Sequence, residues 1–233
     1  MAVRVETATA RTLVLAVPGW PGHLAGQHVD IRLTAEDGYT AVRSYSLAAD
    51  PVEDRIEVTV EQVEDGEMSP YLAAEVTVGD RMEVRGPIGG WFVWRPGQTE
   101  QVQLIAGGSG VVPLMAMIRA RAVAGVAVPF RLLYSVRTPE SIIYQQELSR
   151  PSGGLDVSYA YTRQVPDGWP RPPGRVGPAL LTQATWPAEL TPTSYVCGPT
   201  GFVETVAALL TDAGHDPASI RTERFGPSGG PSR

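Results

Sequence analysis

One short stretch places three polar residues and a tyrosine where a strand would normally bury aliphatic side chains. Residues 43–46 read Arg-Ser-Tyr-Ser inside the strand-like segment 40–48. A half-buried strand alternates apolar and polar residues, as residues 28–33 do. Residues 43–46 do not, which leaves two interpretations: an edge strand with a solvated face, or a surface built for a ligand.

A glycine-rich turn stands in the second half of the chain. The stretch 104–117, LIAGGSGVVPLMAM, runs from an apolar strand through Gly108, Ser109 and Gly110 into a predicted helix. Glycines permit close approach of a ligand, and a new helix points free N–H groups at an anion. Pro113 replaces the third glycine of the usual fingerprint and suits the first turn of a helix. The turn is typical of a phosphate-binding loop, although such turns also occur without a ligand.

Polar residues follow three further strands. Ser135 and Arg137 fall at the end of one, where a ribose or its 2′-phosphate would lie, and Arg163 repeats the arrangement one strand later. The alternative is arginines at solvated strand ends. Cys197 also ends a strand, but a lone cysteine is most often a small buried hydrophobe. No histidine or other base lies close to Cys197 in the sequence, so the sequence does not indicate that it is a nucleophile.

The N-terminal half holds a second candidate anion site. Gly66 and Ser69 precede a predicted short helix over residues 69–76, with Ser69 as its N-cap and Pro70 at its first helical position. The same residues also suit a short helix that binds nothing.

Composition excludes several classes of function. The formal net charge of −6 argues against a nucleic-acid partner. All 19 basic residues are arginine, so Schiff-base and P-loop lysine chemistry are excluded. One cysteine cannot hold an iron–sulfur cluster, and no metal site is expected from three histidines without zinc spacing. No apolar run approaches a membrane span and the N-terminus has no signal-peptide pattern, so we expect a cytoplasmic protein.

The elements that must position these residues change character along the chain. Short strands punctuated by Gly, Pro and Asp predict an N-terminal antiparallel β-barrel. Strands alternating with helices then predict an α/β domain with a parallel sheet. We expect domains at residues 1–97 and 98–226, with a flexible tail at 227–233.

In this order, these stretches resemble the ferredoxin–NADP reductase family, the two-domain flavin reductases. Residues 43–46 resemble its flavin motif, and residues 66–69 its pyrophosphate-binding turn. Residues 107–113 resemble its nucleotide phosphate loop. Further matches are residues 86–92, a loop of the bacterial branch, residues 197–199, the nicotinamide-side motif, and residues 223–225, the terminal Glu-x-aromatic.

The resemblance implies bound FAD and a role for each motif. Arg43 would pair with the FAD pyrophosphate, Tyr45 would stack on the isoalloxazine ring, and Ser46 would hydrogen-bond near flavin N5. Ser46, Glu223 and Cys197 would form the catalytic centre. The implied cofactor-binding residues are Arg43, Ser44, Tyr45, Ser46, Gly66, Met68, Ser69, Gly108, Ser109, Gly110, Pro113, Ser135, Arg137, Arg163, Cys197, Gly198, Pro199 and Phe225.

The resemblance also implies a hydride donor and an electron acceptor. The donor would be NAD(P)H, and Arg137 with Arg163 favours NADPH because both could meet a 2′-phosphate. Because no ferredoxin segment is present, the acceptor would be a separate redox protein: a ferredoxin, a flavodoxin or an oxygenase centre. A free flavin or ferric reductase, or an electron-transfer subunit without independent turnover, are the alternatives.

Overall fold

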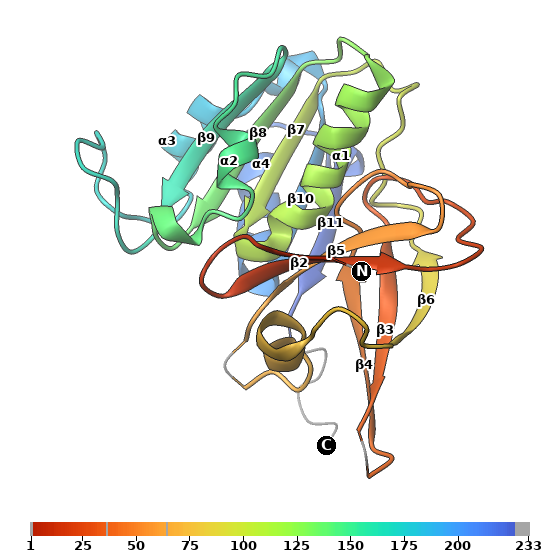
Figure 1. The fold of residues 1–233 in the computed structure, drawn as a ribbon. Helices are drawn as coiled ribbons and strands as arrows, with labels where there is room; N and C mark the ends of the chain where they lie inside the picture. Colours follow the sequence, from red (N-terminus) through yellow and green to blue (C-terminus); the bar gives the residue numbers. More distant parts are fainter. Residues whose placement is uncertain (1, 36, 64, 227–233) are drawn as a thin grey trace, which may run out of the picture. The chain divides into compact units, whose positions relative to one another are not determined.

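The computed structural model describes residues 2–35, 37–63 and 65–226, so the predicted tail at 227–233 lies outside the described residues (Figure 1). The chain divides into two compact units. The first comprises Met1–Gln98, Val112–Val126 and Glu140–Arg150, and the second comprises Thr99–Val111, Ala127–Pro139 and Pro151–Arg233. Each unit therefore draws on separated stretches of sequence.

The first unit is built on antiparallel strands in two sheets. One has the order β1–β2–β5 and the other β4–β3–β6, and an antiparallel bridge between Leu47 and Val58 joins β5 to the segment after β4. Alternate residues of these strands enclose one hydrophobic core. The antiparallel prediction for the N-terminal half is confirmed. The strands are β1 (Ala2–Val5), β2 (Ala10–Ala16), β3 (His28–Thr34), β4 (Thr40–Ser46), β5 (Arg55–Glu61) and β6 (Glu83–Ile88).

The predicted helix at 69–76 is a single turn of π-helix, Tyr71–Glu75. Its N-cap residue is Pro70, and no side chain caps it. The prediction of Ser69 as N-cap is wrong because its hydroxyl oxygen instead accepts a hydrogen bond from the backbone N–H of Val63 at 3.0 Å. Ser69 thereby closes the loop that precedes the helix.

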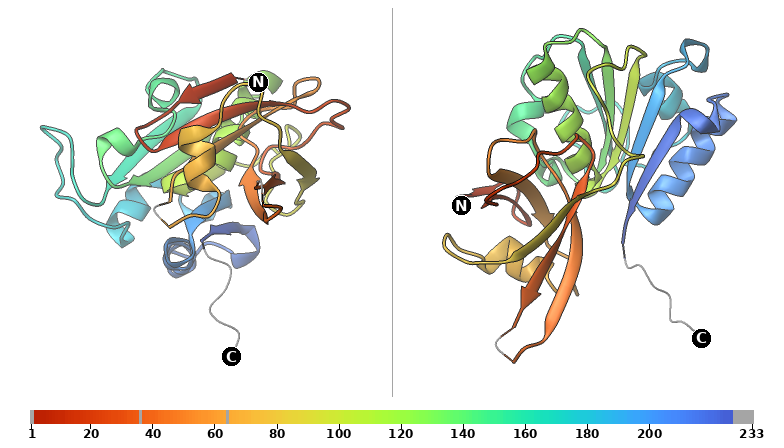
Figure 2. Two further views of the ribbon diagram at one scale, coloured as in Figure 1. Left: turned by 60° about the horizontal axis from the view of Figure 1, so that its bottom comes forward. Right: turned by 90° about the vertical axis from the view of Figure 1, so that its right-hand side faces the viewer.

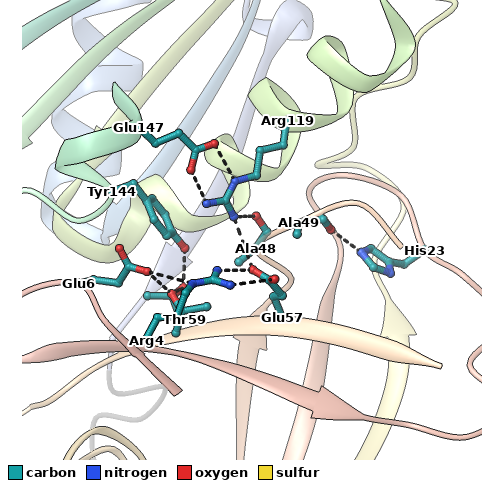
Figure 3. Close-up of polar contacts among 11 residues, drawn as sticks. Arg4, Glu6, His23, Ala48, Ala49, Glu57, Thr59, Arg119, Tyr144 and Glu147 are labelled. Atoms are coloured by element: carbon teal, nitrogen blue, oxygen red, sulfur yellow. Dashed lines mark hydrogen bonds and ion pairs between the residues drawn. The ribbon is translucent and has the colours of Figure 1, made fainter. Parts of the chain in front are cut away.

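A buried arginine ties distant parts of the first unit together (Figure 3). Arg119 lies on helix α1 (Val111–Ala124), and only 18% of its side chain is exposed. Its Nε and Nη2 donate to the two carboxylate oxygens of Glu147 at 3.0 and 2.6 Å, and its Nη1 donates to the carbonyl of Ala48 at 2.7 Å. The guanidinium carbon lies 4.7 Å from the ring centroid of Tyr144. Burying the charged Arg119 guanidinium costs free energy. The Glu147 carboxylate, the Ala48 carbonyl and the face of the Tyr144 ring offset this cost.

Polar contacts extend from this arginine to β5 and the N-terminal strand. Arg119 Nη1 lies 3.8 Å from Glu57, which also accepts two hydrogen bonds from Arg4 at 3.2 and 2.6 Å. The buried Tyr144 hydroxyl is hydrogen-bonded to Thr59, whose hydroxyl lies 2.7 Å from that of Thr12 (Figure 3). The network links residues 4–12, 48–59, 119 and 144–147, all of which belong to the first unit.

The second unit is a five-stranded parallel sheet, as predicted for the second half of the chain. The strand order is β11–β10–β7–β8–β9, and every neighbouring pair is parallel (Figure 1). Helices α3 (Pro178–Ala184) and α4 (Thr200–Asp212) share a hydrophobic core with the sheet. Both helices lie on the same face of the sheet (Figure 2). The strands are β7 (Val102–Gly107), β8 (Phe130–Val136), β9 (Leu155–Tyr161), β10 (Thr193–Pro199) and β11 (Ile220–Phe225).

The segment at residues 139–149 is not one continuous helix. It contains a 3₁₀ turn, Pro139–Ser141, and the short helix α2 (Gln145–Leu148). Tyr144, between them, has φ +62°, in the left-handed region that a continuous helix cannot contain. The backbone leaves the helical path where the Tyr144 side chain enters the buried network.

None of the helices in the described residues combines the length and apolar character that crossing a bilayer requires.

Replacing Arg119 with methionine should lower the free energy of unfolding by about 3 kcal/mol, because it leaves the Glu147 carboxylate and the Ala48 carbonyl without their hydrogen-bond donor. Urea denaturation of the two proteins measures the difference. Arg32→Met removes a partner from the exposed Arg32–Glu83 pair and should cost less than about 1 kcal/mol. Equal losses in both variants would contradict the special role of Arg119.

Candidate functional site

The Arg-Ser-Tyr-Ser stretch lies on β4, an edge strand of its sheet, and its four side chains differ in exposure. Arg43 and Ser44 are exposed, Tyr45 is half-buried and Ser46 is buried. Ser44 donates a 2.6 Å hydrogen bond to Asp30 on the neighbouring strand β3. Burial therefore increases along the strand, from an exposed cation at Arg43 to a buried hydroxyl at Ser46.

The Ser46 hydroxyl is buried yet has no hydrogen-bond partner among the described residues. Burying a hydroxyl without a hydrogen-bond partner costs free energy, so such a group in a native protein usually binds a ligand or a water molecule. Tyr45, beside it, packs against the barrel core, and burial raises the pKa of its hydroxyl to about 12. The end of β4 thus offers a neutral phenol ring and an unused hydroxyl.

The turn at 66–69 is closely packed around its glycine. A Cβ at Gly66 would stand 2.3 Å from Ser69 Oγ, so only glycine fits there. Met68 is 2% exposed and belongs to the barrel core, so its side chain points away from solvent. Glu67 reaches β4, where it forms an ion pair with Arg43 and accepts a hydrogen bond from the Tyr39 hydroxyl. The structure therefore brings the turn and the 43–46 strand together.

The second unit gathers its predicted residues at one edge of the parallel sheet. Five parallel strands end there, and the residues of interest sit at or just past their carboxyl ends. The chain runs from β7 outward to β9 and then returns past β7 to β10, so the strand order reverses between β7 and β10. Open parallel sheets bind ligands at this reversal. The residues placed at this edge are Gly108, Ser109, Gly110, Ser135, Arg137, Arg163, Cys197, Gly198, Pro199, Glu223 and Phe225.

The glycine turn and the Cys-Gly-Pro segment meet at the reversal point. A Cβ at Gly110 would stand 2.2 Å from the carbonyl oxygen of Cys197, and one at Gly198 would stand 3.0 Å from the carbonyl of Gly107. Gly108 has φ +55°, and Pro113 lies in the first turn of helix α1 as predicted. The glycines let two strand ends approach within backbone contact, which leaves the start of α1 facing the sheet edge.

Cys197 and Glu223 are register partners on β10 and β11. Burial raises the pKa of the Cys197 thiol well above its ordinary value, and the neighbouring Glu223 carboxylate raises it further. Burial also raises the pKa of Glu223 to about 7. The thiol is therefore neutral and unsuited to nucleophilic attack, whereas the carboxyl is poised to gain or lose a proton near neutral pH.

Two exposed arginines follow neighbouring strands at the far end of this edge, Arg137 after β8 and Arg163 after β9. The backbone N–H of Arg163 donates to the carbonyl of Arg137 at 2.9 Å. Within the described residues neither guanidinium forms an ion pair. Ser135, just before Arg137, is buried on β8. Two free guanidiniums beside a strand end form a site suited to a phosphate.

Sequence reasoning missed two charged residues of the first unit, Arg119 and Glu67. Arg119 is one of only two charged residues in an otherwise apolar helix, and this pattern was a usable signal for a buried pair. Glu67 gave no signal, because nothing in the sequence places it opposite Arg43.

Gly110→Ala should destabilise the protein by about 3 kcal/mol, because the new methyl group would collide with the backbone of Cys197. Thermal unfolding measures the loss. The matched control is Gly201→Ala on α4, where a Cβ meets nothing within 4 Å and the change should be neutral or slightly stabilising. A stable Gly110→Ala protein would show that the two strand ends are not in contact.

Glu223 should make stability depend on pH. Its folded-state pKa of about 7 exceeds the ordinary value of 4.5, so the folded state binds its proton more tightly. Stability should therefore fall as pH rises from about 4.5 to about 7. Urea denaturation should find wild type and Glu223→Gln alike at the acid end of this window and wild type less stable above it. A difference that does not change with pH would contradict this assignment.

Comparison with known proteins matches both halves of the chain. The model described as "Oxidoreductase FAD-binding domain" matches residues 7–93, and that described as "Oxidoreductase NAD-binding domain" matches residues 104–208.

Similar proteins include reductase components of oxygenase systems. The chain is 30% identical over 207 residues to the glycine betaine monooxygenase reductase subunit of Chromohalobacter salexigens, covering 86% of this chain and 55% of the relative. It is 29% identical over 212 residues to the ferredoxin–NAD(P)(+) reductase component of the naphthalene 1,2-dioxygenase/salicylate 5-hydroxylase systems of Ralstonia sp, covering 88% and 61%. The chain thus spans little more than half the length of these relatives.

A solved structure agrees over nearly the whole chain. The flavohem-like FAD/NAD-binding domain of nitric oxide dioxygenase from Vibrio cholerae O1 biovar El Tor superposes with a TM-score of 0.84 at 27% identity, covering 97% of this chain and 96% of that one. The order of motifs, the two matched domains and this shared fold agree with one another. The chain belongs to the ferredoxin–NADP reductase family of FAD- and NAD(P)-binding oxidoreductases.

Proposed function

We propose that the chain is an FAD-dependent reductase that takes a hydride from NAD(P)H and passes single electrons to a separate protein acceptor. The observation that carries this proposal is the meeting of the glycine turn, Cys197 and Glu223 at the reversal point of a parallel sheet. In this proposal residues 1–97 hold the flavin and residues 98–226 hold the nicotinamide nucleotide.

The residues of the first unit fit a flavin. The buried Ser46 hydroxyl lacks a partner, Tyr45 offers an aromatic face beside it, and Arg43 supplies a cation for the pyrophosphate. Gly66 and Ser69 keep the facing turn compact, and Met68, whose side chain is in the core, would contribute through its backbone. FAD, when bound, supplies the acceptor for the hydride and the donor for one-electron steps.

The residues of the second unit fit a dinucleotide. Gly108, Ser109 and Gly110 would hold its pyrophosphate at the start of helix α1. Pro113 would set that helix start, and Gly198 with Pro199 would line the nicotinamide side. Ser135, Arg137 and Arg163 would hold the adenosine ribose, and the two arginines favour NADPH over NADH.

Three residues would serve the chemistry directly. Ser46 would hydrogen-bond the flavin, and Glu223, with its pKa near neutrality, would hold or relay a proton. Cys197, a neutral buried thiol, would shape the nicotinamide position rather than attack it. Phe225, half-buried at the end of β11, would cover the flavin in the absence of nucleotide.

The acceptor is proposed from the relatives, several of which are named as reductase components of oxygenase systems. A ferredoxin, a flavodoxin or an oxygenase redox centre fits this class. A free flavin or ferric reductase would instead lose FAD on gel filtration and reduce added flavin quickly. An electron-transfer subunit of a larger complex would retain FAD and turn over slowly when alone.

Steady-state assays test the proposal. The protein supplied with FAD should oxidise NAD(P)H when ferricyanide, an artificial one-electron acceptor, is present, and the rate should depend on FAD. Tyr45→Ala should lose FAD on desalting while remaining folded by circular dichroism. Activity without FAD, or full flavin retention by Tyr45→Ala together with Arg43→Ala, would contradict the assignment.

Arg137→Ala should lower kcat/KM for NADPH by about tenfold, the value of one charge-assisted contact to a phosphate, and leave that for NADH nearly unchanged. The ratio of the two donors' kcat/KM values in wild type and variant is the measurement. An equal loss for both donors would indicate that Arg137 does not meet a 2′-phosphate.

A further inference from the structure

The arginine proposed to bind the flavin pyrophosphate already has an anionic partner. Arg43 Nη2 forms an ion pair with the carboxylate of Glu67, and Nη1 donates to the carbonyl of Val42 at 2.7 Å. Two of its three nitrogen atoms are thus engaged within the protein. Any phosphate that binds the fork of this guanidinium must replace at least one of these acceptors.

Glu67 is held in place from a second side. Its other carboxylate oxygen accepts a hydrogen bond from the hydroxyl of Tyr39, which stands just before β4. This hydrogen bond to Glu67 also raises the pKa of Tyr39 above its ordinary value. Glu67 therefore links the 66–69 turn to two positions around β4, and its negative charge lies where a pyrophosphate would need a cation.

A carboxylate and a pyrophosphate can bind arginine in the same way, because each is an anion whose oxygen atoms accept paired hydrogen bonds from the guanidinium group. They also repel each other. The side chains of Arg43 and Glu67 are 56% and 31% exposed, so water and salt weaken their attraction, and the pair can open at modest cost. With these properties, Glu67 can compete with a phosphate for Arg43, and the Arg43–Glu67 pair need not be a permanent part of the structure.

We propose that Glu67 is an affinity-determining residue that competes with the FAD pyrophosphate for Arg43 and holds flavin affinity below the level that Arg43 alone would give. The inference rests on the proposed function, because it takes the ligand of Arg43 to be FAD. Flavin binding then opens the Arg43–Glu67 pair, and the affinity depends on ionic strength through both the lost pair and the carboxylate–phosphate repulsion.

The test measures the Kd of flavin-free protein for FAD by isothermal titration calorimetry, at low and high salt. Glu67→Gln keeps the shape and the Tyr39 contact but removes the charge, and it should lower Kd about fivefold at low salt. Asp65→Asn makes the same charge change in the same turn without a contact to Arg43, and it should change Kd less than twofold. In an Arg43→Ala background, Glu67→Gln should have a smaller effect, because the pair is already lost and only the carboxylate–phosphate repulsion remains.

Four outcomes would overturn the inference. Unchanged or weaker FAD binding by Glu67→Gln would show that the carboxylate does not compete. An equal gain from Asp65→Asn, or a full gain from Glu67→Gln in the Arg43→Ala background, would show that net charge alone acts. If Arg43→Ala binds FAD as wild type does, the flavin assignment of Arg43 fails as well. If Arg43→Ala weakens binding while Glu67→Gln changes nothing, only the competition fails.

Discussion

The first unit depends on the hydrogen bonds and ion pairs that the guanidinium of Arg119 forms. A charge on an apolar helix must find acceptors once buried, and Arg119 finds three from separate parts of the sequence: Glu147, the Ala48 carbonyl and Glu57. Ala48 follows Ser46 by two residues, so the arginine holds the backbone just after the strand that carries the proposed flavin-binding residues (Figure 3). The position of the unpartnered Ser46 hydroxyl is thereby set by a residue that lies more than seventy positions away.

A second constraint acts in the second unit, where backbone contact replaces charge. Gly110 and Gly198 allow the strand ends of β7 and β10 to touch, and any side chain at Gly110 would separate them. The close contact places the glycine turn, the buried thiol of Cys197 and the carboxyl of Glu223 at one point of the sheet edge. Burial at that point is also what raises the pKa of Glu223 to about 7, so packing and acid–base chemistry have the same cause.

Sequence patterns predicted the elements that are specified by residues close together in the sequence. The short alternating strands, the glycine turn and the strand–helix rhythm each predict their own structure, and the sheet edge follows from parallel strands ending together. The failures involve partners far apart in sequence. Tyr144 leaves the helical path to reach Thr59, Ser69 bonds to Val63 rather than capping a helix, and Arg43 meets Glu67 across a turn. Strands β1 and β11 are short, and each is defined by the strand with which it pairs.

Stoichiometric anaerobic reduction tests the central claim, that one chain binds both FAD and NAD(P)H and transfers a hydride between them. Purified protein saturated with FAD would be titrated with NADPH while the visible absorption of the flavin is recorded. We predict that one equivalent of NADPH bleaches the flavin completely, because one hydride carries the two electrons that FAD accepts. A protein that binds no FAD, or whose flavin keeps its absorption with excess NADPH and NADH alike, would contradict the account.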